Sequence, residues 1–277
     1  MAKILIIGCG AIGTGLAVML SAQGHDVTGV KRSPPPVSDT LIHYCSADIT
    51  SAKDLEKLSG DFDALFFIVS ADGRTEQSYR DVYETGLANV LARFSGLPWI
   101  FVSSTSVYGQ SQGEWVDENS IAQPDKITSK LIRQAELRLI EANPQNIIVR
   151  FSGIYGPGRE YLIRMAQQAP AIQKEPPYFT NRIHQRDCVA VLAFLLERRL
   201  SGSALEQCYL ASDDDPAPVW EVMSWLAEQM RCQAPTVKAA GNDAELNKRC
   251  NNQRLKALGY QFHYPSYKDG YLELIQR

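Results

Sequence analysis

Hydrophobic residues along this 277-residue chain fall into two alternating kinds of segment. Short runs of apolar and β-branched residues, typical of buried strands, alternate with longer stretches in which apolar residues recur every three or four positions, typical of helices. The short runs cover 3–7, 26–30, 41–45, 64–70, 99–104, 146–151 and 207–211, and the helical stretches between them include 12–24, 79–94 and 129–142. This alternation predicts an α/β fold, a doubly wound parallel sheet with helices on both faces.

The alternation weakens beyond Gly158, where an extended segment and further helical patterns follow. Those helical patterns cover 187–199, 219–230 and 251–259. We therefore predict a larger sheet domain formed by 1–150 and 181–210, and a smaller substrate-binding part formed by 151–180 and 211–277. In the larger domain, Ser129 is expected to cap the helix at 129–142, because a hydroxyl often accepts a hydrogen bond at a helix start.

Composition narrows the classes of function. Hydrophobic residues make up 45% and charged residues 21% of the chain, and the net charge is −3. This balance allows a sizeable core and argues against nucleic acid or an anionic membrane as partner, so a small-molecule substrate is expected. The six cysteines form no C-x-x-C pair and have no histidine at ligand spacing, so we expect no metal site and no disulfide framework. Because MAKILIIGCGAIG reaches glycines before a secretory core or a membrane span could form, the protein is expected to be cytoplasmic.

Glycines at positions 8, 10 and 13 follow the first predicted strand and open the first predicted helix. Gly8 permits a tight turn, Gly10 lets a pyrophosphate approach the backbone, and Gly13 allows close packing of helix on strand. With the intervening Ala11 and Ile12, this segment predicts a dinucleotide site at the positive end of the helix. The alternative is a glycine turn that only packs.

The end of the second predicted strand indicates which dinucleotide is bound. NAD-binding folds usually place an acidic residue there for the ribose 2′-hydroxyl, but this strand is followed by Lys31 and Arg32, which suit a 2′-phosphate. The sequence therefore favours NADP over NAD. The alternative is a solvated pair of basic residues at the entrance of a loop.

A run of four hydroxyl residues, 103–106, leaves the fifth predicted strand. Hydroxyls at this position either cap the next element or face the cleft at the carboxyl edge of the sheet, where open α/β folds bind ligands. We expect Ser104 to face the cleft, and Ser103, Thr105 and Ser106 to shape the turn.

Five motifs appear in the order found in the extended short-chain dehydrogenases/reductases, which the chain resembles over nearly its whole length. They are the glycine motif, SSTSVYG, RFSGIYGPG, the IHQRD segment and NNQRLKALGY. The likeness is greatest to an atypical subgroup, the NAD-dependent epimerase/dehydratase-like proteins that lack the catalytic tyrosine. It implies a Rossmann domain that binds a nicotinamide cofactor, with Ser104 as the catalytic hydroxyl, Asp48 and Ile49 near adenine, and Ser70 along the cofactor.

The family's Tyr-x-x-x-Lys signature is incomplete in this chain. Lys130 matches the lysine that holds the nicotinamide ribose and is counted with Ser104 as catalytic, and Glu136 matches an acidic residue further along the helix. Lys126 stands where the tyrosine is expected. A tuned proton carrier typically contributes about 100- to 10,000-fold to such reactions, so the loss of this tyrosine bears directly on activity. Extended relatives often dimerise through two long helices, here near 78–94 and 129–142, so a homodimer is an expectation from the resemblance.

Two hypotheses follow for the function. The first is an NAD(P)-dependent oxidoreductase or epimerase/dehydratase-like enzyme acting on a small polar, nucleotide-sugar-like substrate. In it Ser104 orients the substrate, Lys130 holds the ribose, and water or a substitute residue moves the proton. The second is a non-catalytic NADP-binding sensor or interaction protein on the same fold, since a fold does not fix a function.

Overall fold

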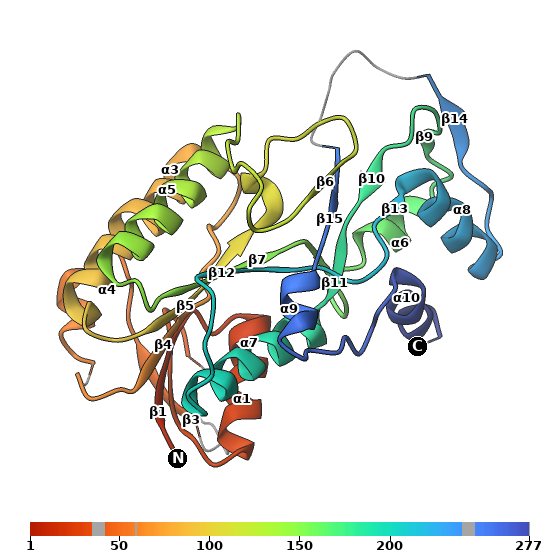
Figure 1. The fold of residues 1–277 in the computed structure, drawn as a ribbon. Helices are drawn as coiled ribbons and strands as arrows, with labels where there is room; N and C mark the ends of the chain where they lie inside the picture. Colours follow the sequence, from red (N-terminus) through yellow and green to blue (C-terminus); the bar gives the residue numbers. More distant parts are fainter. Residues whose placement is uncertain (35–41, 59, 240–246, 277) are drawn as a thin grey trace. The chain divides into compact units, whose positions relative to one another are not determined.

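The computed structural model describes residues 1–34, 42–58, 60–239 and 247–276 (Figure 1). Its central feature is a seven-stranded parallel sheet with the strand order β12-β7-β5-β4-β1-β2-β3. The strands are β1 (Lys3–Ile7), β2 (Asp26–Lys31), β3 (Ile42–Ser46), β4 (Ala64–Phe67), β5 (Trp99–Ser104), β7 (Ile147–Phe151) and β12 (Cys208–Ala211). This confirms the predicted doubly wound fold.

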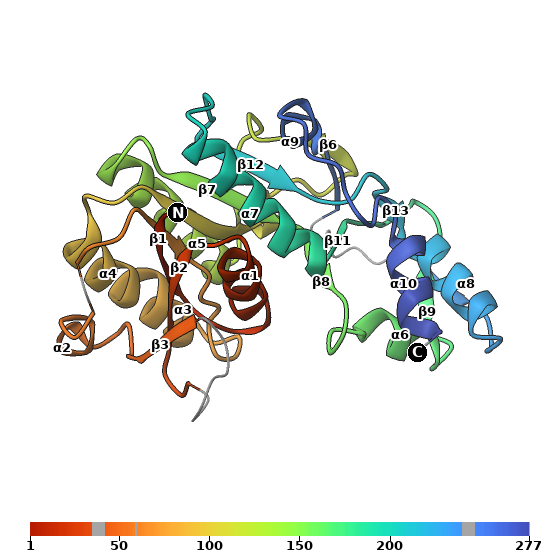
Figure 2. The same cartoon turned by 90° about the horizontal axis from the view of Figure 1, so that it is seen from below.

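Helices cover both faces of this sheet. Figure 2 shows α1 and α7 on one face and α3, α4 and α5 on the other. The bounds are α1 (Ala11–Ala22), α2 (Ala52–Leu55), α3 (Glu76–Arg80), α4 (Leu87–Phe94), α5 (Ile127–Ala142) and α7 (Gln185–Leu200). Helix α1 packs closely on α7 because Gly15 has no side chain: a Cβ there would lie 3.0 Å from Val189 Cγ2.

The strands at the middle of the sheet are buried on both faces, which explains their continuous apolar sequences. Every residue of β4 and β7 is buried, as is every residue of β1 after Lys3. Aromatic rings fill the space over neighbouring strands: Phe67 stacks on Trp99 and Phe101 with ring centroids 6.1 and 5.5 Å apart. The sheet core therefore fixes the strand ends from which the polar loops leave.

Two details of the predicted helices differ from the structure. The segment 79–94 is not one regular α-helix, because a π-helical stretch, Asp81–Gly86, separates α3 from α4. Ser129 was expected to cap the next helix, but α5 begins two residues earlier, with Lys126 at the N-cap position and no side-chain cap hydrogen bond. Ser129 is instead buried within the first turn.

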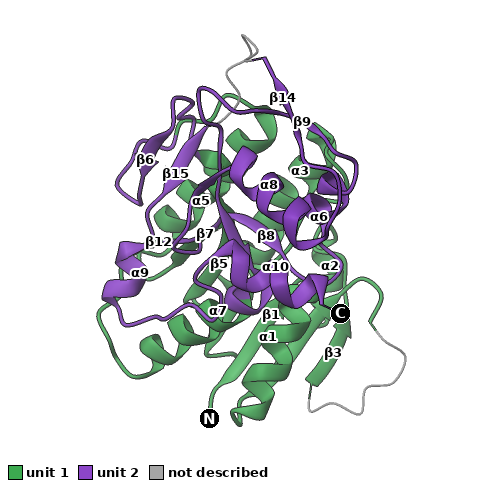
Figure 3. Cartoon of the chain, turned by 90° about the vertical axis from the view of Figure 1, so that its right-hand side faces the viewer, with its two compact units in different colours: residues 1–107, 123–150, 189–209 green, residues 108–122, 151–188, 210–277 purple. Residues whose placement is uncertain are grey.

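The chain divides into two compact units (Figure 3). Unit 1 comprises 1–107, 123–150 and 189–209, and unit 2 comprises 108–122, 151–188 and 210–277. These boundaries differ from the sequence-based ones at 108–122 and 181–188, and by the single residue Leu210. The reason is strand pairing: 114–116 pairs with 248–250, and 182–184 pairs with 153–155, so both segments have their partners in unit 2.

Unit 2 consists of short elements, most of which the sequence pattern did not predict. The strands are β6 (Glu114–Val116), β8 (Gly153–Tyr155), β9 (Ala171–Gln173), β10 (Phe179–Thr180), β11 (Arg182–His184), β13 (Ala217–Pro218), β14 (Thr236–Lys238) and β15 (Lys248–Cys250). The helices are α6 (Tyr161–Ala166), α8 (Val219–Gln229), α9 (Gln253–Ala257) and α10 (Tyr267–Ile275). Strands of two or three residues carry too few positions to show a period.

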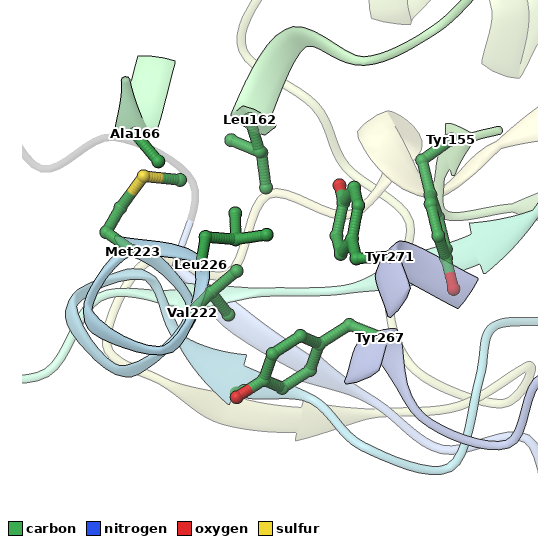
Figure 4. Close-up of a cluster of buried hydrophobic side chains, with 9 residues drawn as sticks. Tyr155, Leu162, Ala166, Val222, Met223, Leu226, Tyr267 and Tyr271 are labelled. Atoms are coloured by element: carbon green, nitrogen blue, oxygen red, sulfur yellow. The ribbon is translucent and has the colours of Figure 1, made fainter. Parts of the chain in front are cut away.

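A cluster of apolar side chains from α6, α8 and α10 forms the core of unit 2 (Figure 4). Tyr155 and Tyr271 meet in this cluster with ring centroids 4.4 Å apart. Gly270 allows that contact, since a Cβ at this position would lie 2.1 Å from the Tyr155 hydroxyl oxygen. Among the described residues, no helix is long and apolar enough to cross a bilayer.

Asp213 of unit 2 is a buried acid with an incomplete set of hydrogen bonds. Its side chain is 0% exposed, Oδ1 accepts from the backbone N–H of Asp215 at 3.3 Å, and Oδ2 has no hydrogen-bond partner among the described residues. Burial raises the pKa of this carboxyl well above its usual range, and the charge of Arg182 opposes that rise only in part.

Asp213→Asn should therefore make the protein more stable than wild type at neutral pH. A carboxyl whose pKa is raised on folding stabilises the fold below its unfolded pKa of about 3.9 and loses that contribution as pH rises through its folded pKa. The unfolding free energies of both proteins can be measured by urea unfolding at several pH values between about 5 and 8. The variant should exceed wild type by a margin that grows as pH rises. Parallel curves for the two proteins would contradict the assignment of a buried, costly charge.

Candidate functional site

The glycine turn at the end of β1 leaves an open space above the start of α1. Gly8 has φ +101°, and a Cβ there would lie 2.6 Å from the carbonyl oxygen of Ile68. A Cβ on Gly13 would lie 2.1 Å from the carbonyl oxygen of Gly8, whereas nothing lies within 4 Å of a Cβ built on Gly10. Two of the glycines are thus required by packing, and Gly10 leaves the helix start accessible to an anion.

A cavity of about 480 Å³ in unit 1 opens beside this turn. It is lined at the carboxyl ends of β1, β2 and β4 and by the loop that follows β3, the edge at which open α/β sheets bind ligands. Of the predicted cofactor residues, the lining includes Gly8, Gly10, Lys31, Arg32, Asp48, Ile49 and Ser70. It does not include Ala11, Ile12, Gly13 or Lys130: the first three form the first turn of α1, and Lys130 lies on α5.

Sequence reasoning missed several residues that line the cavity. They include Asp72 in the loop after β4, Ser78 on α3, and Asp81 and Val82 in the π-helical stretch. The sequence offered one signal for these residues, their position shortly after a predicted strand. That signal does not show which side chains reach the cavity, because the loop and the π-helical turn determine this. The cavity lining therefore carries three carboxyl groups beside the two cations of Lys31 and Arg32.

Asp48 is held in place by its own loop. Its Oδ1 accepts from the backbone N–H and the hydroxyl of Thr50 at 2.9 and 2.8 Å, while its backbone N–H donates to Asp54. Asn89 of α4 donates to the carbonyl oxygen of Ile49 at 2.9 Å, which ties this loop to the helix. Asp48 and Ile49 are therefore fixed at the cavity wall before any ligand arrives.

The four hydroxyls after β5 have separate roles. Ser103 is buried and donates to Glu136 Oε1 at 2.6 Å, so it does not shape the turn as predicted. Ser104 is half-buried, and its Oγ accepts from the backbone N–H of Ser106 at 3.1 Å across the 3₁₀ turn Thr105–Val107. This oxygen therefore caps a turn, the first of the two roles considered for the run, and its hydroxyl hydrogen has no acceptor among the described residues. Ser104 is not part of the lining of the cavity beside the glycine turn, so its predicted place in a cleft stays a prediction.

The first of these hydroxyls, that of Ser103, belongs to a buried ionic network. Glu136 of α5 is 0% exposed and accepts two hydrogen bonds from Arg150 of β7, Nε to Oε1 at 2.8 Å and Nη2 to Oε2 at 2.7 Å. Arg133 adds a third donor to Oε2 at 2.7 Å. With the bond from Ser103, the Glu136 carboxylate connects β5, α5 and β7, and so fixes the strand end that presents Ser104 relative to the helix that carries Lys130.

Lys126 and Lys130 lie at the start of α5, and both side chains are exposed. The backbone N–H of Lys130 donates to the carbonyl oxygen of Lys126 at 3.0 Å, as expected for residues one turn apart. Lys126, which stands where the family tyrosine is expected, is at the N-cap position.

Comparison with known proteins agrees with this geometry. Residues 4–202 match the model of the NAD dependent epimerase/dehydratase family. Protein YeeZ of Escherichia coli (strain K12) is 29% identical over 224 residues, which cover 75% of this chain and 78% of that protein.

Solved structures of similar proteins have the same fold. A Methylobacillus flagellatus protein assigned to the NAD-dependent epimerases/dehydratases is 38% identical, with a TM-score of 0.83 over 99% of this chain and 98% of its own. The human epimerase family protein SDR39U1, solved with NADPH, shares the fold at 20% identity and a TM-score of 0.76, covering 99% of each chain.

Glu136→Gln should cost about 3–5 kcal/mol of unfolding free energy, because it removes the charge of Glu136 from its ion pair with the buried guanidinium of Arg150. Denaturant unfolding measures the loss, with Glu141→Gln on the exposed side of the same helix as control. If the two variants unfold at the same denaturant concentration, the network does not stabilise the fold as argued.

Proposed function

Since the chain belongs to the NAD dependent epimerase/dehydratase family, we propose that it binds NADP(H) in the cavity of unit 1, in preference to NAD(H). The observation that carries the proposal is that one cavity is lined by Gly8, Gly10, Lys31 and Arg32. The backbone at the start of α1 suits a pyrophosphate, and the two cations suit a 2′-phosphate. Asp48 and Ile49 would border the adenosine portion.

We propose further that the protein is an oxidoreductase or epimerase/dehydratase-like enzyme acting on a small polar substrate of the nucleotide-sugar class. The bound nicotinamide would supply hydride acceptance and donation. Ser104, whose hydroxyl hydrogen has no acceptor among the described residues, would donate a hydrogen bond to the reacting oxygen of the substrate, and Lys130 would hold the ribose. The hydroxyl proton would pass to water or to another group, because Lys126 is exposed and no tyrosine occupies its position.

The same substitution supports a second candidate, a non-catalytic NADP-binding sensor or interaction protein. A protein that only senses its cofactor needs no proton carrier, and in this chain Lys126 stands where the family tyrosine is expected. The two candidates share the cofactor site and differ in whether Ser104 takes part in turnover.

Cofactor choice is tested by calorimetric titration with NADPH, NADP⁺, NADH and NAD⁺. Wild type should bind NADPH most tightly. The double variant Lys31→Ala/Arg32→Ala should lose at least about tenfold in NADPH affinity, since charge-assisted bonds to phosphate are lost, while its affinity for NADH should change little. An equal loss for NADPH and NADH would contradict a 2′-phosphate role, and no binding of any dinucleotide would overturn the proposal.

Catalysis is tested with NADPH or NADP⁺ and a panel of nucleotide-sugars. Absorbance of the reduced nicotinamide follows net oxidation or reduction, and chromatographic analysis of the sugar product follows epimerisation or dehydration, in which the cofactor is regenerated. Ser104→Ala should lower kcat by about 100-fold or more while leaving NADPH affinity within about twofold, and Ser104→Thr, which keeps the hydroxyl, should retain most activity. Circular dichroism checks that Ser104→Ala keeps the overall secondary structure of wild type. Equal kcat in Ser104→Ala and wild type would remove Ser104 from the mechanism, and NADPH binding with no turnover of any compound favours the sensor.

A further inference from the structure

The guanidinium of Arg32 is already engaged by an acid of the same cavity. Arg32 Nη2 forms an ion pair with Asp72 Oδ2, and both side chains are largely exposed, at 63% and 71%. Arg32 follows β2 and Asp72 lies in the loop after β4, and these two strands lie on either side of β1. The ion pair therefore joins the two loops that flank the glycine turn at the end of β1.

Two carboxyl groups affect Arg32, a feature that the basic pair of Lys31 and Arg32 in the sequence does not indicate. Asp72, by its hydrogen bond and charge, and Asp48, by its charge, raise the pKa of the Arg32 guanidinium. Both acids line the same cavity as Lys31 and Arg32. A 2′-phosphate entering here would meet one cation already partnered and a carboxylate close beside it.

On the proposed NADP(H) function, we infer that Asp72 is a specificity-determining residue that lowers affinity for NADP(H) and not for NAD(H). The 2′-phosphate must displace the Asp72 carboxylate from Arg32, and it also experiences the repulsion of that carboxylate. NAD(H), which has no 2′-phosphate, leaves the ion pair intact. Because an exposed ion pair is weak, a phosphate near charge −2 can open it, so Asp72 reduces selectivity without abolishing it.

Two consequences distinguish this role from a merely structural one. Asp72 should act only through the 2′-phosphate, so its effect should appear with NADPH and be absent with NADH. The effect should also shrink as ionic strength rises, because exposed charges are screened over about 8 Å at physiological salt.

Asp72→Asn, which keeps the shape and removes the charge, is the direct test by calorimetric titration. NADPH affinity should rise by about 5- to 20-fold at low salt, in the range of ordinary coupling between a charge and a ligand, and NADH affinity should stay within about twofold. Asp61→Asn is the matched control, because Asp61 is an exposed acid ion-paired with Lys3 outside the cavity. It should change neither affinity.

A double-mutant cycle locates the effect on Arg32. In the Arg32→Ala background, Asp72→Asn should raise NADPH affinity by much less than in wild type, because no cation remains to be released. If Asp72→Asn raises NADPH affinity equally in both backgrounds, repulsion by the Asp72 carboxylate alone accounts for the effect. The inference that the 2′-phosphate competes with Asp72 for Arg32 is then overturned.

The remaining outcomes separate this inference from the proposed function. If wild type binds NADPH and Asp72→Asn binds it equally, the inference fails and the cofactor proposal stands. If Asp72→Asn weakens both NADPH and NADH, Asp72 contacts the cofactor itself, and the inference is likewise overturned. If neither protein binds any dinucleotide, it is the proposed function that fails.

Discussion

The Glu136 carboxylate holds together the part of unit 1 that presents the candidate catalytic residues. Burying a carboxylate is costly unless nearly all its hydrogen-bonding capacity is used, and here Ser103, Arg133 and Arg150 all donate to it. The three donors come from β5, α5 and β7, so the network can form only when these three elements are packed together. Ser104 follows directly after one donor, and Lys130 lies on the helix that carries Glu136. The geometry proposed for catalysis thus depends on an interaction that does no chemistry.

The shape of the cavity in unit 1 depends on a different constraint, the close approach of one backbone segment to another. The glycine turn forms because Gly8 and Gly13 lack side chains that would collide with carbonyl oxygens, which leaves the start of α1 open. Charge then decides what can bind. On the proposed function, Lys31 and Arg32 would favour a phosphate, while Asp72 forms an ion pair with Arg32, so selectivity between the two dinucleotides would depend on the balance among these side chains.

Much of this arrangement could be predicted from the sequence, because the responsible signals are local. Buried strands give continuous apolar runs, the glycine motif directly follows a strand, and Lys31 and Arg32 directly follow the apolar run of another. The fold and the residues at the strand ends therefore followed from the pattern. Glu136 was found only through the family resemblance, which indicated an acidic residue but not its partners.

What could not be predicted depends on residues far apart in the sequence. Arg32 and Asp72 are separated by 40 positions and come together only because β2 and β4 flank β1. The short strands β6 and β15 pair across more than a hundred residues, which is why 108–122 belongs to unit 2. The role of Ser103 likewise depends on Glu136, 33 positions away. No periodicity within one segment carries such information.

The central claim is that the cavity beside the glycine turn receives NADP(H) with its 2′-phosphate at Lys31 and Arg32. A crystal structure of the protein grown with NADPH tests this most directly. The account predicts the pyrophosphate over Gly10 at the start of α1, the 2′-phosphate within hydrogen-bond distance of Arg32, and the Asp72 carboxylate moved off that guanidinium. A nucleotide bound elsewhere, or a 2′-phosphate directed away from both cations, would contradict it.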